Sequence, residues 1–305
     1  MLKNFNHGTA SAAMNFRDNF FPAFTGNSHS VPEGERPRVL VVGAGFGGME
    51  VAWSLQDEPV EVMLLDRHNY HTFQPLLYQV VTAALEPEDV AWSVRDIFQN
   101  QENFSFRMAT VRDVDFEQKT VHVESSDPID YDYLVLAAGA SVDYFGVEGA
   151  EEHAIPVKDL MNSVRLRSHV LQQFENVEKN PDLIDEGTLN FVIVGGGPTG
   201  VETAGALVEL FDKVLRRDFP DLDIDRARVI LVEMKPHLLD PYEESLREYT
   251  LETLRSRGVE VRLEHSVTKA HEDHVVFESG ELLPTQTLIW AAGVKANPLA
   301  DRLDL

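Results

Sequence analysis

Two stretches of the chain carry the same order of apolar and polar positions. The first has a valine-rich run at residues 39–42, followed by GAGFGG and then by apolar side chains at helical spacing. The second has the run FVIV at residues 191–194, followed by GGGPTG and by an amphipathic segment that reaches residue 215. Each pattern predicts a strand, a tight glycine turn and a helix in direct succession.

Both stretches continue in the same way. A second β-rich run ends on an acidic residue, which is Asp66 in the first stretch and Glu233 in the second. Further along, an apolar strand ends in Ala-Ala-Gly, once at residues 137–139 and once at residues 291–293. Small residues at the carboxyl end of a parallel strand leave room for a ligand. The repetition predicts an α/β fold with two Rossmann-like dinucleotide-binding domains.

The glycine turns have the composition of a pyrophosphate site. In G-x-G-x-x-G the first glycine adopts the turn, the second lets the backbone approach the phosphates, and the third lets helix and strand pack closely. The phosphates then lie at the helix N-terminus, where free N–H groups favour negative charge. The glycines at these positions are Gly43, Gly45, Gly48, Gly195, Gly197 and Gly200. For either motif alone, a plain βα turn is the alternative interpretation.

The acidic residues after the second strands set a nucleotide preference. A carboxylate there accepts a hydrogen bond from a ribose 2′-hydroxyl and repels a 2′-phosphate. Glu233 therefore favours NADH over NADPH, and Lys235 weakens that preference. Two dinucleotide sites in one chain indicate hydride transfer between a nicotinamide and a second cofactor, for which FAD on the first unit is the natural candidate.

Shorter patterns fill the segments between the motifs. Alternating runs at residues 104–123 predict small antiparallel strands, and residues 157–177 predict a long surface helix. A helix at residues 242–257 is expected to stop at Gly258. Pro75 opens a further short helical segment with a mixed apolar face.

The composition removes several classes of function. The 305 residues contain no cysteine, which excludes disulfides, iron–sulfur ligation and a redox-active dithiol from this sequence. His68 and His71 lack a third nearby ligand, so polar-loop or ring-packing roles are favoured and no metal site is expected. A formal net charge of −25 disfavours nucleic acid as a partner, and solubility or salt adaptation is its simplest explanation.

No segment has the length and apolarity of a transmembrane helix, so none is expected. Residues 1–36 are polar and lack the basic start and apolar core of a signal peptide. We predict that they form a disordered extension. A misplaced start codon, with Met14 as one possible start, is the alternative.

The order of the motifs resembles the type II NADH:quinone oxidoreductases from residue 38 to the last residue. The segments that carry this resemblance are GAGFGG, DRHNYHTFQPLLYQVVTAAL, YDYLVLAAGA, GGGPTGVETAGAL and LIWAAGV. Both glycine turns are shared by the wider superfamily of two-dinucleotide flavoprotein reductases, whereas PLLYQ and the combination of GPTGVE with WAAGV are narrower. The resemblance implies an FAD/NAD(P)-binding fold, and electron transfer from NADH through FAD to a quinone without proton pumping.

The resemblance also implies roles for individual residues. Around FAD it implies Gly43, Gly45, Gly47, Gly48 and Asp66, with Pro75, Gln79 and Gly139 near the flavin. Around NADH it implies Gly195, Gly197, Gly200 and Glu233, with Gly293 close by. Glu202 matches a family glutamate near the nicotinamide and quinone, where burial beside a reduced, anionic flavin would raise its pKa and suit it to relay a proton. The alternative is an acid that stabilises the first turn of its helix.

Four segments follow from these expectations. Residues 1–36 are the extension, 37–155 the first part of an FAD-binding domain, 156–295 an NADH-binding domain, and 296–305 the start of a return to the first domain. The family continues with a strand, quinone contacts and an amphipathic membrane segment, so the sequence resembles a C-terminally truncated member. The first sheet is then expected to lack its closing strand.

The partners and location follow the same resemblance. NADH and a quinone are the expected partners, and a homodimer is an open alternative. We expect a cytoplasmic protein, or one peripheral on the cytoplasmic face of the inner membrane if the native protein has the C-terminal segment. Two other functions fit the sequence: a soluble flavin-dependent reductase for another acceptor, and a truncated, non-catalytic NADH-binding protein.

Overall fold

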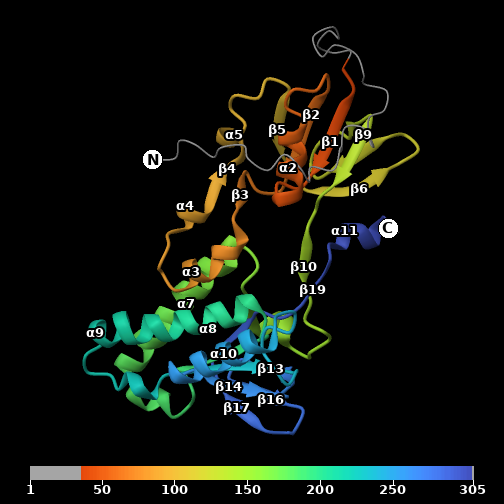
Figure 1. Cartoon of the computed structure of the whole chain (residues 1–305). Coiled ribbons are helices and arrows are strands. Elements are labelled where there is room, and N and C mark those ends of the chain that lie inside the picture. Colours follow the sequence, from red (N-terminus) through yellow and green to blue (C-terminus); the bar gives the residue numbers. More distant parts are fainter. Residues whose placement is uncertain (1–35, 304–305) are drawn as a thin grey trace. The chain divides into compact units, whose positions relative to one another are not determined.

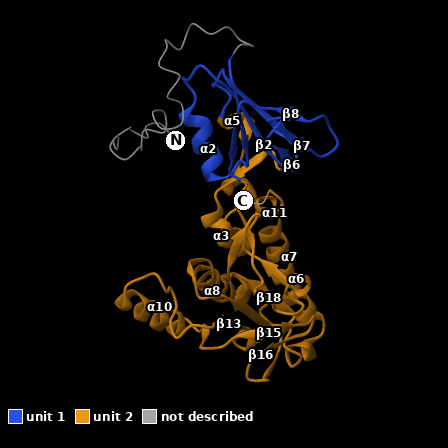
Figure 2. Cartoon of the chain, turned by 90° about the vertical axis from the view of Figure 1, so that its right-hand side faces the viewer, with its two compact units in different colours: residues 1–67, 98–137 blue, residues 68–97, 138–305 orange. Residues whose placement is uncertain are grey.

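The computed structural model describes residues 36–303, which form two compact units (Figure 1, Figure 2). The first unit combines residues 36–67 with Phe98–Ala137, and the second combines His68–Ile97 with residues 138–303. The expected extension at residues 1–36 lies outside the described residues, apart from Arg36. Each unit therefore takes two separate pieces of the chain.

The first unit is built on a parallel sheet with the strand order β5-β2-β1-β9. Its strands are β1 (Arg38–Val42), β2 (Glu61–Asp66), β5 (Phe104–Met108) and β9 (Tyr133–Leu136). Val39, Leu40 and Val41 of the inner strand β1 are fully buried, as is typical of a parallel strand that is covered on both faces. Helix α2 (Phe46–Ser54) follows β1 and packs against β1 and β2.

Strand β5 corrects one expectation. We predicted antiparallel strands throughout residues 104–123, but β5 lies parallel to β2 at the edge of the main sheet. Only Phe106 of β5 is buried, because an edge strand is less completely covered, and the sequence pattern of a strand does not report its direction. The prediction is correct for β6 (Val111–Asp115) and β7 (Thr120–Val123), which pair antiparallel together with β8 (Ile129–Asp130).

The second unit contains a parallel sheet with the strand order β11-β18-β12-β13-β14. Its strands are β11 (Ala154–Pro156), β12 (Asn190–Val194), β13 (Arg228–Glu233), β14 (Glu260–Leu263) and β18 (Thr287–Trp290). The order β14-β13-β12-β18 repeats the order β5-β2-β1-β9 of the first unit. Beside β9, however, the described residues supply no strand equivalent to β11.

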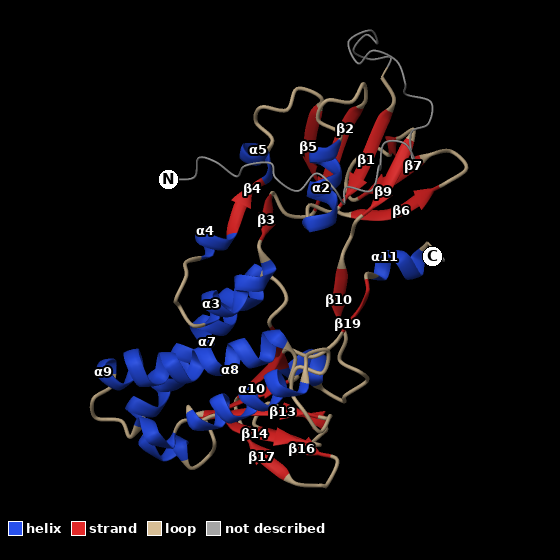
Figure 3. Ribbon diagram, viewed as in Figure 1, coloured by secondary structure: helices blue, strands red, loops and turns tan. Residues whose placement is uncertain are grey.

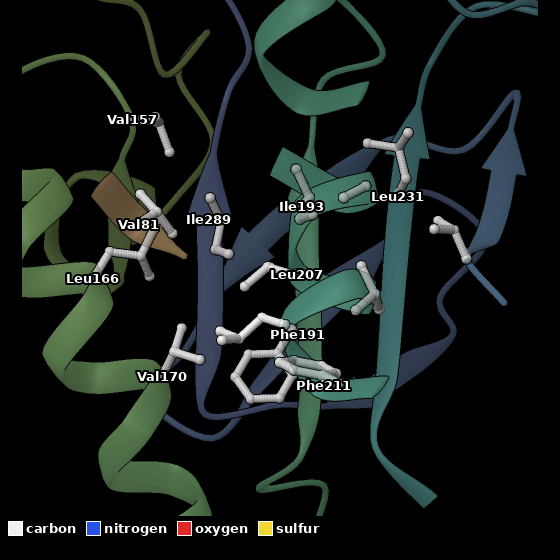
Figure 4. Close-up of a cluster of buried hydrophobic side chains, with 14 of the residues drawn as sticks. Val81, Val157, Leu166, Val170, Phe191, Ile193, Leu207, Phe211, Leu231 and Ile289 are labelled. Atoms are coloured by element: carbon white, nitrogen blue, oxygen red, sulfur yellow. The ribbon is translucent and has the colours of Figure 1, made fainter. Parts of the chain in front are cut away.

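Opposite faces of this second sheet pack against different layers. Phe191 and Ile193 point to the face that carries the helices, whereas Val192 between them belongs to the cluster on the other face, since side chains alternate along a strand (Figure 4). The helical layer consists of α3 (Leu77–Val81), α7 (Leu160–Lys179), α8 (Pro198–Leu210) and α10 (Glu244–Ser256). The opposite layer is the antiparallel sheet of β15 (Val267–Ala270), β16 (His274–Phe277) and β17 (Leu282–Pro284) (Figure 3).

The two long helices of the second unit follow the sequence closely. Helix α7 begins three residues later than the predicted 157–177, and Asp159 caps it by accepting from the Asn162 amide. Although we predicted a surface helix, one face of α7 lies in the core, where Phe174 is fully buried. Helix α10 ends at Ser256, and Gly258 follows with φ +93°, as the predicted glycine stop requires.

The segment His68–Ile97 packs with the second unit, whereas we assigned it to the first domain as part of 37–155. Leu77, Val80 and Val81 of α3 are fully buried or nearly so, in the same core as α7 and α8. Figure 4 shows Val81 beside Leu166. This burial of apolar side chains is the reason for the different division of the chain. The segment contains β3 (Tyr70–Thr72), η1 (Gln74–Leu76), α3, α4 (Pro87–Val90), β4 (Ala91–Ser93) and α5 (Val94–Ile97).

The second unit also contains a two-stranded antiparallel ladder. It pairs β10 (Ala140–Val142) with β19 (Val294–Ala296), the segments that directly follow the two Ala-Ala-Gly sequences. Asn297 then donates from Nδ2 to the Ala138 carbonyl at 3.0 Å and caps helix α11 (Pro298–Arg302). The other elements are α6 (Ala150–His153), η2 (Pro181–Ile184), η3 (Phe211–Leu215), α9 (Arg216–Asp218) and η4 (Ile224–Arg226).

Candidate dinucleotide-binding sites

The second glycine turn connects β12 to α8. Gly195 has φ +116°, a backbone conformation that favours glycine, and its amide donates to the Val232 carbonyl at 2.9 Å. A Cβ on Gly200 would lie 1.9 Å from the Gly195 carbonyl oxygen. Any side chain at residue 200 would therefore push α8 away from the turn. The structure thus requires glycine at both positions.

Gly197 differs from these two glycines, because no atom lies within 4 Å of the position that its Cβ would occupy. It is the N-cap of α8, and it has no side chain that could cap the first amides of the helix. Open space together with the free N–H groups of a helix N-terminus is the arrangement that binds phosphate. The residues present therefore fit a dinucleotide pyrophosphate.

The first glycine turn repeats this geometry between β1 and α2. Gly43 has φ +110°, and its amide donates to the Leu65 carbonyl at 2.7 Å. A Cβ on Gly48 would lie 1.8 Å from the Gly43 carbonyl oxygen, whereas the corresponding position on Gly45 is open. Gly47 tolerates a Cβ, which would contact Ala137 at 4.0 Å. This turn fits a second pyrophosphate equally well.

The two predicted acidic residues also hold the turns in place. The Ala44 amide donates to Asp66 Oδ2 at 2.7 Å, and the Gly196 amide donates to Glu233 Oε2 at 2.6 Å. Glu233 Oε1 accepts a second bond from the Lys235 amide at 2.9 Å. Sequence reasoning missed this structural role, since it considered only ribose as the donor. The carboxylates therefore occupy fixed positions beside each turn.

The Ala-Ala-Gly strand ends lie beside the glycine turns. This is where a ligand binds in a parallel sheet, at the carboxyl ends of the strands. A Cβ on Gly195 would lie 2.8 Å from the carbonyl carbon of Ala291, so the second turn and the end of β18 are in close contact. Gly139 and Gly293 have φ +70° and +62°, and both can therefore make the sharp exit from their strands. Phe145 lies over Gly293, with its Cζ atom 2.2 Å from where a Cβ would be.

Glu202 lies in the second turn of α8 with its side chain exposed. Neighbouring protein atoms remove part of its hydration, and this desolvation raises the pKa of Glu202. A carboxylate stabilised by the N-terminus of its helix would instead have a lowered pKa. The direction of the shift therefore disfavours a purely capping role.

The PLLYQ segment lies in the second unit. Pro75 is exposed in η1, and Gln79 is half-buried in α3, where its Nε2 donates to the Tyr78 hydroxyl at 3.0 Å. Helix α3 packs against α7 and α8, so the segment adjoins the helix that carries Glu202. His68 stacks on Tyr70 with ring centroids 5.1 Å apart. No group of three or more metal-ligating side chains occurs within residues 36–303.

The fold and both turns define a protein with two Rossmann-like nucleotide-binding sheets. The chain belongs to the pyridine nucleotide-disulphide oxidoreductase family, whose profile matches residues 37–305. The predicted fold class is thereby confirmed. The 305 residues contain no cysteine, so they supply no thiol for disulphide chemistry.

Similar proteins carry more specific names. The chain is 36% identical to the type II NADH:quinone oxidoreductase NdhA of Mycobacterium tuberculosis and covers 58% of that protein with 87% of its own length. It is 33% identical to Ndh of the same organism and covers 59% of it. The structure of NDH2 from Plasmodium falciparum in complex with NADH matches with a TM-score of 0.84 at 23% identity, over 88% of this chain and 57% of that one. The chain thus spans less than two thirds of these relatives.

Within the described residues, no helix combines the length and apolarity that crossing a membrane requires.

Proposed function

We propose that the chain is a flavin-dependent oxidoreductase that takes hydride from NADH onto FAD and passes the electrons to a quinone without pumping protons. The observation that carries the proposal is the presence of two glycine turns with the same geometry in one chain. One nucleotide site suffices for a simple dehydrogenase, whereas transfer between two cofactors requires two. The names of the similar proteins support a quinone as the acceptor.

In this proposal the first glycine turn anchors FAD and the second glycine turn anchors NADH. The residues proposed to hold FAD are Gly43, Gly45, Gly47, Gly48, Asp66, Pro75, Gln79 and Gly139. Those proposed to hold NADH are Gly195, Gly197, Gly200, Glu233 and Gly293. Bound FAD would supply the two-electron chemistry that no side chain of this sequence can provide.

In this proposal the chain's own residues bind the pyrophosphates, orient the riboses and supply a proton to the acceptor. The amides that follow Gly45 and Gly197 at the starts of α2 and α8 would bind the pyrophosphates, and the helix dipoles would favour the negative charge. The carboxylates of Asp66 and Glu233, which are bonded to the turns, would accept hydrogen bonds from ribose hydroxyls. Glu202 holds a proton more readily than an ordinary glutamate and relays it to the acceptor.

The proposal includes a location and an assembly. A quinone is a lipid-soluble acceptor, so we propose a cytoplasmic protein that meets its acceptor at the cytoplasmic face of the inner membrane. Peripheral attachment through a segment outside this sequence and a homodimer are both compatible with the proposal. Co-sedimentation with quinone-containing vesicles and light scattering of the purified chain test these two points.

The test of function uses the visible absorption of bound flavin in the purified 305-residue chain. We expect a flavin spectrum that bleaches when NADH is added under argon, and that returns when a soluble quinone is added. The Gly197→Ala variant is the matched control, since it should keep the flavin spectrum and require a higher NADH concentration for bleaching. A colourless protein that added FAD cannot reconstitute would contradict the proposal.

A non-catalytic NADH-binding protein is the second candidate. It is favoured by the second glycine turn, which offers a pyrophosphate site at Gly197 and the N-terminus of α8 without any residue of the first unit. Such a protein would bind NADH without retaining flavin. A spectrum that NADH bleaches but quinone does not restore would instead favour a reductase for another acceptor.

A further inference from the structure

The loop that follows β13 closes around the second glycine turn. Glu233 at the end of β13 accepts from the Gly196 amide, and the Leu239 amide donates back to the Gly196 carbonyl at 2.8 Å. A Cβ on Gly196 would lie 2.7 Å from Leu238 Cδ2 and 2.9 Å from Glu233 Cγ. Glu233, Leu238 and Leu239 of this loop are therefore held against the turn at which the nucleotide is proposed to bind.

Two cationic or basic side chains of this loop share one carboxylate. Lys235 Nζ lies 2.5 Å from Asp240 Oδ2, and His237 Nε2 lies 2.5 Å from Asp240 Oδ1. The bonds to Lys235 and His237 lower the pKa of Asp240 to about 2, so the carboxyl is ionised at neutral pH. Each carboxylate oxygen of Asp240 is thus bonded to one basic side chain of the loop, Oδ2 to Lys235 and Oδ1 to His237.

This pairing bears on the choice between NADH and NADPH. A basic side chain near the acidic residue after the second strand is the feature that accommodates a 2′-phosphate. Lys235 has the position for that role, and its amide is bonded to the carboxylate that would oppose a 2′-phosphate. Asp240 supplies a second negative charge and occupies the Lys235 ammonium group. Neither Lys235 nor His237 is therefore an unpaired cation beside the second glycine turn.

We propose that Asp240 determines the nucleotide preference of the second site, because its pairing with Lys235 and His237 leaves neither side chain free for a 2′-phosphate. The inference rests on the proposed binding of NADH by the second unit. Asp240 acts through Lys235 and is a positioning residue. No part of the sequence pattern indicates this role, since Asp240 lies seven residues beyond the acidic end of β13.

The test measures dissociation constants for NADH and NADPH with the whole chain by isothermal titration calorimetry. Asp240→Asn keeps the size of the side chain and removes its charge. We expect NADPH to bind about three- to tenfold more tightly, with NADH changed less than about twofold, as is reasonable for a partly exposed charge pair. The gain should shrink at high salt because exposed charges are screened.

Matched variants separate charge from structure. Glu209→Gln removes the same charge from another exposed carboxylate paired with a lysine, Lys213, and should leave both dissociation constants unchanged. Adding Lys235→Gln to Asp240→Asn should abolish the gain for NADPH, and Asp240→Glu should restore the wild-type ratio. Equal weakening of both nucleotides in Asp240→Asn would indicate a merely structural residue and overturn the inference.

The same data distinguish the inference from the proposed function. The inference alone is overturned if the wild-type chain binds NADH but Asp240→Asn leaves the ratio of the dissociation constants for NADPH and NADH unchanged. A wild-type chain that binds neither nucleotide overturns the proposed function and the inference with it.

Discussion

A Cβ on Gly200 would lie 1.9 Å from the carbonyl oxygen of Gly195, and the pair Gly48 and Gly43 has the same relationship at 1.8 Å. In each unit this close approach lets the first turn of the helix pack directly against the glycine turn that precedes it. The N-terminus of the helix then faces the open position at Gly197 or Gly45. Packing and ligand binding are therefore assigned to different glycines of the same motif.

Gly200→Ala is expected to destabilise the second unit by about 2–4 kcal/mol, because the methyl group overlaps a backbone atom that cannot move independently. Thermal unfolding of the purified variant measures the effect. Gly205→Ala on the same helix is the control, since its Cβ would make only an ordinary contact of 3.7 Å with Leu254. That control should stabilise the protein by up to about 1 kcal/mol. Equal melting temperatures for the two variants would contradict the steric explanation.

Gly197→Ala is expected to leave stability unchanged and to weaken NADH binding at least about tenfold, since its methyl group enters space left for the pyrophosphate. Titration calorimetry with NADH, alongside thermal unfolding, separates the two effects. Gly45→Ala should act in the same way on FAD retention while leaving NADH binding intact. Unimpaired NADH binding by Gly197→Ala would place the nucleotide elsewhere.

His169 should make stability depend on pH. Its Nε2 lies 3.0 Å from both the Gln286 carbonyl and Thr287 Oγ1, and burial lowers the pKa of His169 below its ordinary value. In the unfolded chain His169 takes up a proton near pH 6.5, whereas in the folded chain it stays neutral at that pH. The free energy of unfolding therefore falls as the pH drops through about 6.5. Urea unfolding between pH 8 and pH 5 should show a shallower pH dependence for His169→Gln than for the wild type. The exposed His122, changed to Gln, serves as the control, and an identical slope in the wild type and His169→Gln would refute the assignment.

Glu202→Gln should bind NADH with a dissociation constant within about twofold of the wild type, because the side chain keeps its size and remains exposed. The rate of quinone reduction should fall about 10²-fold or more, the usual contribution of a positioned proton donor. Desolvation raises the pKa of Glu202, so the wild-type rate should change across a pH range above the usual glutamate value of about 4.3. Steady-state rates from pH 5 to pH 8 test whether the variant lacks this change. Glu209→Gln on the same helix is the control, and a Glu202→Gln profile like that of the wild type would count against proton relay.

Much of the site could be predicted from the sequence because its chemistry is local. A glycine turn, the helix after it and the acidic residue at the end of the next strand lie within about 40 residues, and their steric requirements are visible in residue type alone. Gly43, Gly48, Gly195 and Gly200 accordingly have the conformations or contacts that the motif predicts. The repetition of the pattern was sufficient to predict two sheets of one class.

Only the tertiary structure decided which distant segments pack together. Residues 68–97 follow the first nucleotide motif in sequence, but burial of Leu77, Val80 and Val81 places them in the second unit. The direction of β5 and the pairing of Asp240 with Lys235 and His237 likewise depend on contacts that no periodicity reports. Apolar burial and charge pairing act between side chains that folding brings together, whereas the steric demands of a glycine turn are already present in the order of its residues.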